Sequence, residues 1–411
     1  MKVLFLAHRI PFPPNKGDKI RSFNVLRYLA ARHEVSVGCL VDDEADLRYL
    51  PQLRSLVKTV AFDRVRPRLA QLAALPGMVR SRALSVSYFH SRRLQEAVDS
   101  LLAAGDIGAI FCSSSPMAEY LFRSSQPAQV AAAARVMDLI DVDSEKWRQY
   151  AESRPPWAAW IYRYEARCLA AYEERILRAF DRVLVVSEAE KRQIPPHLQL
   201  PNLRSMPNGV DLEYFSPGHA RRYPTSGPTL VFTGVMDYWP NVDGVEWFVN
   251  RIFPRIRAAV PDVRVLIVGN RPTAQVRKLA ATAGVTVTGF VEDVRDYVNA
   301  AQVCIVPLRI ARGIQNKLLE AMAMGKAVIS TPQAFEGLRA QAGRDVLVAE
   351  DEASFADTAV QLLADEQRRA QLGRNARECV ERHYAWAASL RDLDDLIRPD
   401  AGQRLQPKWA T

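Results

Sequence analysis

The sequence contains two successive series of short, β-rich apolar runs, with segments of helical apolar spacing between them. The first series is Val3–Ala7, Val35–Val41, Ala109–Cys112, Val136–Ile140 and Val183–Ser187. The second series is Leu230–Thr233, Val263–Val268, Val285–Thr288, Val303–Pro307 and Val328–Thr331. Continuous rather than alternating apolar strands between helices are typical of parallel sheets that are covered on both faces. The pattern therefore predicts an α/β protein with two doubly wound parallel-sheet domains.

Length and composition agree with this division. A chain of 411 residues exceeds one ordinary hydrophobic core, and 48% hydrophobic residues exclude a disordered or collagen-like chain. The turn-rich stretch 195–217 is the expected junction, so we predict domains over 1–205 and 206–384. A further helix is expected over 385–398, followed by a loose tail over 399–411.

The sequence predicts no membrane-spanning or secreted form. Its longest stretch without Asp, Glu, Lys or Arg is the 14 residues Tyr223–Met236, which include prolines. The apolar run at Met1–Ala7 is too short for a signal peptide, so we expect a cytoplasmic protein. Its five cysteines lie far apart, which favours reduced thiols over disulfides or a metal centre.

The net charge of +9 comes mainly from the first half, where residues 1–205 hold 30 Lys and Arg against 22 Asp and Glu. The densest part has no acidic residue and contains Arg64, Arg66, Arg68, Arg80, Arg82, Arg92 and Arg93. Apolar residues lie between them, and such a segment suits an anionic lipid surface. A solvated basic face explains it equally well. No nucleic-acid-binding motif accompanies the charge, so we expect no nucleic-acid partner.

The segment 307–330 carries the strongest functional signal. It predicts a strand, a basic loop, a helix closed by Gly325 and another strand. Gly313 lets the backbone approach a ligand, and the N–H groups of the following helical turn favour an anion. Lys317 and Glu320 share a helical face, as a diphosphate followed by a ribose diol would require. The alternative is an ordinary surface ion pair.

This segment resembles the retaining glycosyltransferases of family 4, whose GT-B architecture has two facing Rossmann-like domains with a cleft between them. Three further segments keep the family's order: Val185–Glu188, Pro207–Asp211 with Phe215, and Gly289–Val291 with Asp293. Tyr384–Trp386 is similar to the start of the terminal helix that returns to the first domain. The resemblance implies that residues 1–205 bind the acceptor and residues 206–384 bind a nucleoside diphosphate sugar.

A narrower resemblance is to the glycosyltransferases of the exosortase (PEP-CTERM) exopolysaccharide system. It rests on Ala7–Arg21, Asp138–Trp147 and Thr331–Gly337. It implies a role in exopolysaccharide synthesis, with a saccharide or lipid-linked saccharide as acceptor. From the basic first half we expect a cytoplasmic protein that works in peripheral contact with the inner face of the cytoplasmic membrane.

The resemblance assigns Glu320 to the ribose hydroxyls, because it matches the later of two family glutamates. The earlier position holds Arg312, which cannot accept a hydrogen bond, so the donor-sugar contact is not carried over. The Arg and Lys that commonly bind the diphosphate after the first strand of the second domain are also missing, and other cations must replace them. The predicted donor site comprises Gly234, Val291, Arg309, Arg312, Gly313, Lys317 and Glu320.

In the first domain, the loop that contains Gly17 resembles the one that closes over donor phosphate or acceptor. Asp18 and Arg21 follow it, and His8 ends the first strand. We assign these four residues to an acceptor or phosphate loop. The alternative is a loop that only anchors a core helix.

Asp138, Asp141 and Asp143 follow a strand and precede a helix, and a carboxylate there could orient or deprotonate an acceptor hydroxyl. We predict Asp141, then Asp143, as catalytic residues; the alternative for Asp143 is a helix cap. The GT-B resemblance implies neither metal nor cofactor, although Asp141 and Asp143 are spaced as in metal-binding Asp-x-Asp motifs.

The sequence thus predicts a retaining hexosyltransferase that acts on a nucleoside diphosphate sugar. The alternative is a GT-B saccharide- or nucleotide-binding assembly protein that has lost transfer activity.

Overall fold

The computed structural model describes residues 1–14, 17–65, 82–152, 155–219, 221–311 and 313–398. Four arginines named above, Arg66, Arg68, Arg80 and Arg312, lie outside the described residues, as does the predicted tail 399–411. The chain forms two compact units. Unit 1 comprises Met1–Met206 and the residues from Leu390 on, and unit 2 comprises Pro207–Ser389.

Within the described part of unit 1, seven parallel strands form one sheet in the order β3-β2-β1-β4-β5-β6-β7. The strands are β1 (Lys2–Ala7), β2 (Glu34–Val41), β3 (Thr59–Arg64), β4 (Ile107–Ser113), β5 (Ala134–Ile140), β6 (Arg182–Val185) and β7 (Leu203–Ser205). The two edge strands, β3 and β7, were not predicted. β3 is partly exposed along its length and β7 has only three residues, so neither shows a continuous apolar run.

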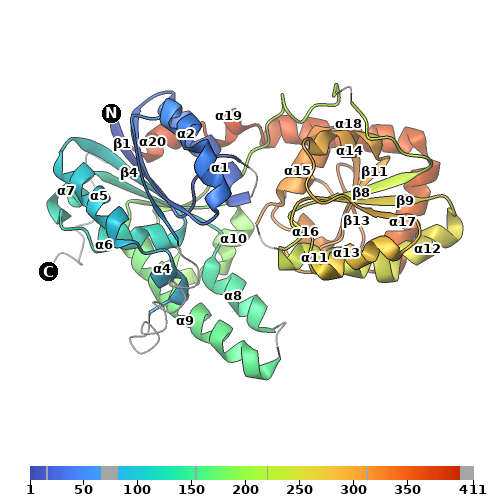
Figure 1. Cartoon of the computed structure of the whole chain (residues 1–411), viewed down its shortest axis with the longest axis horizontal. Helices are drawn as coiled ribbons and strands as arrows, with labels where there is room; N and C mark the ends of the chain where they lie inside the picture. The colour runs from blue at the N-terminus through green and yellow to red at the C-terminus, as the bar shows by residue number, and fades with distance from the viewer. Residues whose placement is uncertain (15–16, 66–81, 153–154, 220, 312, 399–411) are drawn as a thin grey trace. The chain divides into compact units, whose positions relative to one another are not determined.

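Helices cover both faces of this sheet (Figure 1). They are α1 (Gly17–Ala30), α2 (Leu50–Leu56), α4 (Leu84–Tyr88), α5 (Arg92–Ala103), α6 (Glu119–Phe122), α7 (Pro127–Ala132), α8 (Asp143–Glu152), α9 (Pro156–Ala179) and α10 (Glu188–Gln193). On one face, α5, α7 and α9 bury Val98, Val130 and Ile176 in a cluster with strand residues such as Leu4 and Met137. Prolines 155 and 156 separate α8 from α9, as the sequence predicted.

Unit 2 repeats the plan. Among its described residues, six parallel strands form one sheet in the order β10-β9-β8-β11-β12-β13. They are β8 (Thr229–Thr233), β9 (Arg264–Val268), β10 (Val285–Val287), β11 (Val303–Val306), β12 (Ala327–Ser330) and β13 (Leu347–Val348). The sequence predicted all but β13, whose two residues are too few for a pattern. The predicted fold class, two doubly wound parallel sheets, is confirmed.

Helices also cover both faces of the second sheet (Figure 1). They are α11 (Trp239–Trp247), α12 (Phe253–Ala259), α13 (Ala274–Lys278), α14 (Val294–Ala300), α15 (Asn316–Ala323), α16 (Pro332–Phe335), α17 (Glu352–Ala364) and α18 (Glu366–His383). A π-helical turn over Phe248–Ile252 joins α11 to α12. In the described residues, no helix combines the length and the apolar character that crossing a bilayer requires.

The end of the described chain packs in unit 1. After α19 (Trp386–Ser389), α20 (Leu393–Leu396) lies beside α1. The Asp394 carboxylate accepts a hydrogen bond from the Tyr28 hydroxyl at 3.3 Å and lies 3.1 Å from His33 Nε2. These contacts tie the segment after Ser389 to the first sheet.

Candidate functional site

The candidate site of unit 2 lies where the order of its sheet reverses. β8 pairs with β9 on one side and with β11 on the other, so the connections after β8 and β11 run in opposite directions (Figure 1). In open parallel sheets, ligands bind outside the carboxyl ends of the strands at such a point. We therefore expect the binding residues on the loops that follow β8 and β11.

The loop after β8 is held by a buried asparagine on α11. Asn241 Nδ2 donates to the carbonyl of Val235 at 2.9 Å, and the side chain is 3% exposed. A Cβ at Gly234 would lie 2.7 Å from the same amide nitrogen, so only glycine fits there. The predicted binding residue Gly234 thus lies directly against Asn241.

Lys317, in the first turn of α15, reaches this loop. Its Nζ donates to Asn241 Oδ1 at 2.6 Å and lies 4.8 Å from the centroid of the Phe232 ring at the end of β8. The ammonium group is therefore held inside the site and does not extend into bulk solvent. The same asparagine contacts both the β8 loop and the lysine.

Burial shifts the pKa values of Lys317 and Glu320, the two charged residues of α15, in the direction that favours the neutral form of each. It lowers the pKa of Lys317 to about 8, an effect that the nearby Glu320 carboxylate opposes. It raises the pKa of Glu320 to about 7, and Lys317 opposes that shift. A phosphate bound beside Lys317 would favour its charged form, so the site is prepared for an anion.

Arg309 supplies a second cation on the loop after β11. Its guanidinium makes two hydrogen bonds to the Asp243 carboxylate, at 3.0 and 2.5 Å, and lies 5.6 Å from the Trp247 ring centroid. The Arg309 side chain remains half exposed. Asp243 therefore fixes the position of this arginine and leaves part of the guanidinium accessible.

Gly313 and the start of α15 have the local structure that the sequence predicted. Gly313 has φ +59°, a left-handed conformation that favours glycine. Gln315, at the N-cap of α15, makes no capping hydrogen bond with its side chain. The backbone N–H groups of the first turn can thus serve a ligand.

The motif at 207–211 contacts the first residue of α15. Asn208 Nδ2 donates to Asn316 Oδ1 at 3.2 Å, and the Val210 N–H donates to the carbonyl of Tyr384 at 2.7 Å. The Asp211 carboxylate accepts hydrogen bonds from two backbone N–H groups of the following turn. Asn208 therefore contacts the first residue of α15, and the Asp211 carboxylate serves the turn that follows it.

Val291, also predicted for the donor site, and Asp293, from the motif that includes it, make contacts within unit 2. Val291 packs against the hydrophobic core of unit 2, and the nearby Asp293 caps α14. Asn241 and Asp243 were not among the predicted site residues. Their signal was present: both are polar, lie two residues apart, and follow β8 where the family's usual cations are missing.

In unit 1, His8 and Asp18 lie together after β1. His8 Nε2 is 3.1 Å from an Asp18 oxygen, and Arg9 donates to the same oxygen at 2.6 Å. Burial would raise the pKa of the Asp18 carboxyl, but the hydrogen bond from His8 and the charge of Arg9 hold it well below its usual range. Gly17 begins α1 beside this cluster.

Arg21, predicted as part of the acceptor or phosphate loop, lies inside unit 1. Its guanidinium is fully buried, makes two hydrogen bonds to Asp138 at 2.7 and 2.9 Å, and donates to the carbonyl of Met206. A residue in this position anchors α1 to β5 and cannot reach a ligand. For Arg21 these bonds favour the alternative, in which the loop anchors a core helix.

Asp141 and Asp143 follow β5, as predicted. Asp141 is partly exposed, and Asp143 begins α8 and accepts a hydrogen bond from the Ser115 hydroxyl at 3.0 Å. At the start of α8, Glu173 of α9 accepts hydrogen bonds from both the N–H and the hydroxyl of Ser144. Burial raises the pKa of Glu173 to about 8, although the bonds from Ser144 oppose the shift.

One group in the described residues brings potential metal ligands together. His219, Asp293 and Asp296 have ligand atoms within 4.8 Å of one another. Both oxygens of Asp293 already accept hydrogen bonds from the Arg295 guanidinium, and Asp296 pairs with His219. These partners use the carboxylates, so the group is better explained as an ion-pair network.

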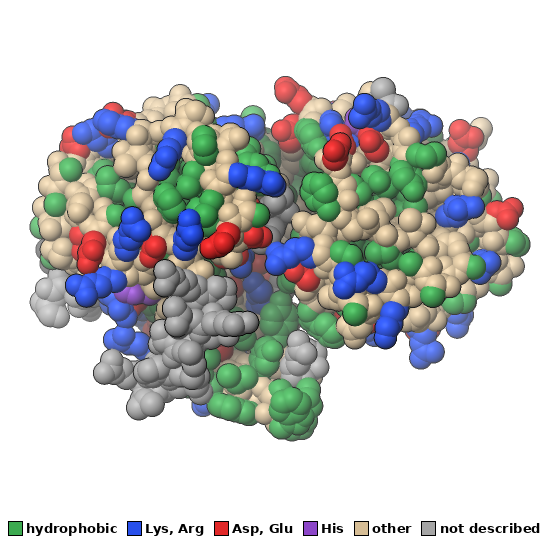
Figure 2. Space-filling model, in the orientation of Figure 1, with side chains coloured by type: hydrophobic (Ala, Val, Ile, Leu, Met, Phe, Trp, Pro, Cys, Tyr) green, Lys and Arg blue, Asp and Glu red, His purple; other side chains and the backbone are tan. Residues whose placement is uncertain are grey.

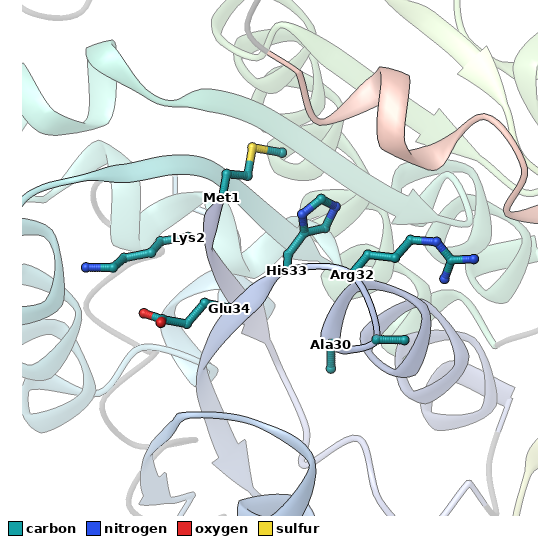
Figure 3. A pocket seen from close by; sticks show the side chains of 7 residues that line it. Met1, Lys2, Ala30, Arg32, His33 and Glu34 are labelled. Atoms are coloured by element: carbon teal, nitrogen blue, oxygen red, sulfur yellow. The ribbon is translucent and has the colours of Figure 1, made fainter.

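A shallow hollow also lies at the amino ends of β1 and β2 (Figure 3). Its charged groups already have partners: Lys2 pairs with Asp106, and His33 pairs with Asp394. It lies at the edge of the sheet away from Asp141. The residues that line it are Met1, Lys2, Ala30, Ala31, Arg32, His33 and Glu34.

Comparison with known proteins gives the site a context. Residues 227–365, which include Arg309, Lys317 and Glu320, match the family model "Glycosyl transferases group 1". A Klebsiella pneumoniae relative, described as an uncharacterized 44.6 kDa protein in the cps region, is 19% identical over 93% of this chain and 96% of its own. A phosphatidyl-myo-inositol mannosyltransferase from Mycolicibacterium smegmatis is 32% identical over 44% of this chain and 48% of its own.

Solved structures share the fold over nearly the whole chain. Sucrose-phosphate synthase from Thermosynechococcus elongatus has a TM-score of 0.73 at 19% identity, covering 96% of this chain and 98% of its own. Anabaena HepE in complex with UDP-glucose has a TM-score of 0.67 at 15% identity, with the same coverage. The chain therefore has the GT-B fold.

Proposed function

We propose that this chain, whose residues 227–365 match the group 1 glycosyl transferase family model, transfers a sugar from a nucleoside diphosphate sugar to a saccharide or lipid-linked saccharide. The observation that carries the proposal is the position of Lys317 and Glu320 at the point where the order of the second sheet reverses. A cation held at the end of β8 and a carboxylate one helical turn later match a diphosphate followed by a ribose.

The donor diphosphate would bind between Lys317, Arg309 and the N-terminus of α15. Lys317 and Arg309 replace the cations that group 1 relatives commonly carry after the strand equivalent to β8. Both can stabilise the charge that develops on the leaving phosphate. Glu320 would accept hydrogen bonds from the ribose hydroxyls. That HepE binds UDP-glucose on the same fold supports a donor of this class.

Transfer would proceed with retention of configuration. The leaving phosphate takes up the acceptor proton, so the mechanism requires neither a covalent nucleophile nor a metal. Asp141, at the carboxyl end of β5, would orient the acceptor hydroxyl in unit 1, with Asp143 beside it. The His8 and Asp18 pair contributes polar groups at the same edge of the sheet.

The acceptor belongs to cell-surface polysaccharide synthesis in this proposal. The relative from a capsule region supports that role over nearly full length. We propose a role in exopolysaccharide synthesis at the cytoplasmic face of the membrane, and the three segments that resemble exosortase-associated transferases support it. Hexose is the sugar class that we propose for the donor.

Nucleotide binding by a Glu320→Ala variant tests the proposal. Calorimetry with UDP, GDP, ADP and dTDP first identifies the base that the parent prefers. Loss of a charged hydrogen bond costs about 1.5 to 3 kcal/mol, so we expect about ten- to a hundredfold weaker binding of that nucleotide. Glu378→Ala, an exposed change on α18, is the control and should bind like the parent.

A folded Glu320→Ala variant with the parent's affinity would remove Glu320 from the ribose site. The same preparations distinguish a transferase from a binding protein. With a donor sugar and membrane extract, the transferase releases nucleoside diphosphate. A protein that has lost transfer activity binds the donor and releases none.

A further inference from the structure

The helical hairpin formed by α8 and α9 extends past the first sheet. α9 has 24 residues, a length of about 36 Å at 1.5 Å per residue. β5 has seven residues and spans only about 23 Å. Because α9 leads into the amino end of β6, its first half projects beyond the carboxyl ends of the strands, the edge at which Asp141 lies. Figure 1 shows this hairpin leaving the sheet of unit 1. We call residues 155–168 the hairpin tip.

Two tryptophans of the hairpin tip face solvent. Trp157 is 79% exposed and Trp160 is 54% exposed, and their spacing places them on one side of α9. By contrast, Trp147 and Tyr162 pack against each other with ring centroids 5.3 Å apart. Figure 2 shows hydrophobic side chains gathered at the free end of the hairpin. Large aromatic groups left exposed side by side mark a contact surface.

The exposed charge of the hairpin tip is positive. Arg163 and Arg167 are both exposed, and they follow the two tryptophans on α9. The one carboxylate of the tip, Glu165, is fully buried and accepts hydrogen bonds from the first two backbone N–H groups of α4. The acid is used inside the protein, and only arginines remain at the surface of the tip.

A third arginine, Arg82, lies beside the tip. The ion-paired charges of the hairpin lie on α8. The Tyr164 hydroxyl donates to the carbonyl of Arg82 at 3.2 Å, which places the exposed Arg82 next to α9. On α8, Arg148 bridges Glu145 and Glu152. The apolar and basic surface is therefore the one on α9.

We propose that the hairpin tip docks unit 1 on an anionic lipid surface. Trp157 and Trp160 enter the headgroup region, where tryptophan is favoured, and Arg163 and Arg167 pair with lipid phosphates. A symmetric contact with a second copy would bring the same arginines toward each other, and their repulsion disfavours it. The inference deepens the proposed function and rests on it for one point: docking would bring the Asp141 edge close to a surface that holds lipid-linked acceptors.

Flotation of the full chain with vesicles tests the docking. At low salt we expect the parent to float with phosphatidylglycerol–phosphatidylcholine vesicles and to be released by high salt. The Trp157→Ala/Trp160→Ala variant should bind at least about tenfold more weakly, because apolar area is lost. The Arg163→Glu/Arg167→Glu variant should bind the vesicles at least about fivefold more weakly for each arginine replaced, because each change removes one arginine contact with lipid phosphate.

Matched controls lie on unit 2. Phe290→Ala removes another exposed aromatic ring, which is 76% exposed. Arg277→Glu/Lys278→Glu reverses two exposed charges of α13. Both variants should float like the parent. If they weaken flotation as much as the tip variants, binding is a general charge or apolar effect, and the proposal is wrong.

Two further results would overturn the docking. One is a negative flotation result: either the parent chain stays unbound to anionic vesicles at low salt, or the tryptophan variants float as well as the parent. The other is a dimer, seen by light scattering, that the tryptophan variant abolishes, since the tip would then bind a second copy. Nucleotide binding to the same preparations is read separately: it depends on unit 2 and reports on the proposed function alone.

Discussion

Lys317 donates a hydrogen bond from its Nζ to Asn241 Oδ1 at 2.6 Å, across 76 residues of sequence. The amide of Asn241 donates in turn to the carbonyl of Val235 in the loop after β8. One side chain thus sets the distance between the lysine of α15 and the glycine loop of β8. Both features had been predicted to bind a diphosphate, and Asn241 is the residue that brings them together.

The pH dependence of nucleotide binding should be bell-shaped. Lys317 is charged below its pKa of about 8, so affinity should fall as the pH rises above that value. Glu320 is ionised above its pKa of about 7, so its bonds to ribose should weaken as the pH falls below that value. We expect the tightest binding between about pH 7 and 8. Calorimetry from pH 5.5 to 9.5 measures the two limbs.

Two variants of Lys317 assign the alkaline limb. Lys317→Arg keeps a charge to higher pH and should shift or remove the alkaline limb, whereas Lys317→Met should weaken binding and leave no alkaline limb. A parent profile that is flat between pH 6 and 9 would show that neither group contacts the nucleotide.

Asn241→Ala should weaken nucleotide binding without unfolding unit 2. The change leaves Lys317 Nζ without this acceptor, and a hydrogen bond of this kind contributes about 0.5 to 1.5 kcal/mol, or roughly two- to thirteenfold in affinity. Asn241→Asp should raise the pKa of Lys317 and move the alkaline limb to higher pH. Asn250→Ala, an exposed change nearby, is the control. Parent-like affinity and pH profile in both Asn241 variants would exclude a positioning role.

Asp141→Asn should slow sugar transfer and leave nucleotide affinity unchanged, because Asp141 belongs to unit 1. Asp141 orients the acceptor hydroxyl, and a misplaced reactant can cost about a hundredfold in rate, so we expect a rate lower by at least about tenfold. Asp143→Asn should have the smaller effect, since Asp143 also bonds Ser115. Initial rates with a saturating donor compare the two. Full turnover by Asp141→Asn would remove it from the mechanism.

Asp138→Ala should destabilise unit 1. It leaves the buried Arg21 guanidinium without its carboxylate, and breaking a buried ion pair costs about 3 to 5 kcal/mol. Asp106→Asn breaks the exposed pair with Lys2, suits the left-handed backbone at this position (φ +65°), and should cost about 0 to 1 kcal/mol. Thermal unfolding compares them. If Asp138→Ala keeps the parent's stability but loses transfer, Arg21 and Asp138 serve the reaction and are not a structural anchor.

The local signals in the sequence were sufficient for the elements of the fold. Buried parallel strands must be apolar on both faces, so ten of them appear in the sequence as continuous runs. The left-handed turn at Gly313 and the helix break at residues 155–156 also depend on the chemistry of the residues at those positions. The edge strands β3, β7 and β13 lack this signal because they are partly exposed or very short.

By itself, then, the sequence determined two doubly wound sheets and a basic, glycine-led helix start at the carboxyl edge of the second. Only the tertiary structure decided which polar groups meet. Arg21 and Asp138 lie 117 residues apart, and their pairing depends on β1 and β5 belonging to one sheet with α1 packed over it. The same holds for Lys317 and Asn241. Side-chain partners from different elements depend on strand order and burial, and the spacing of residues along the sequence determines neither.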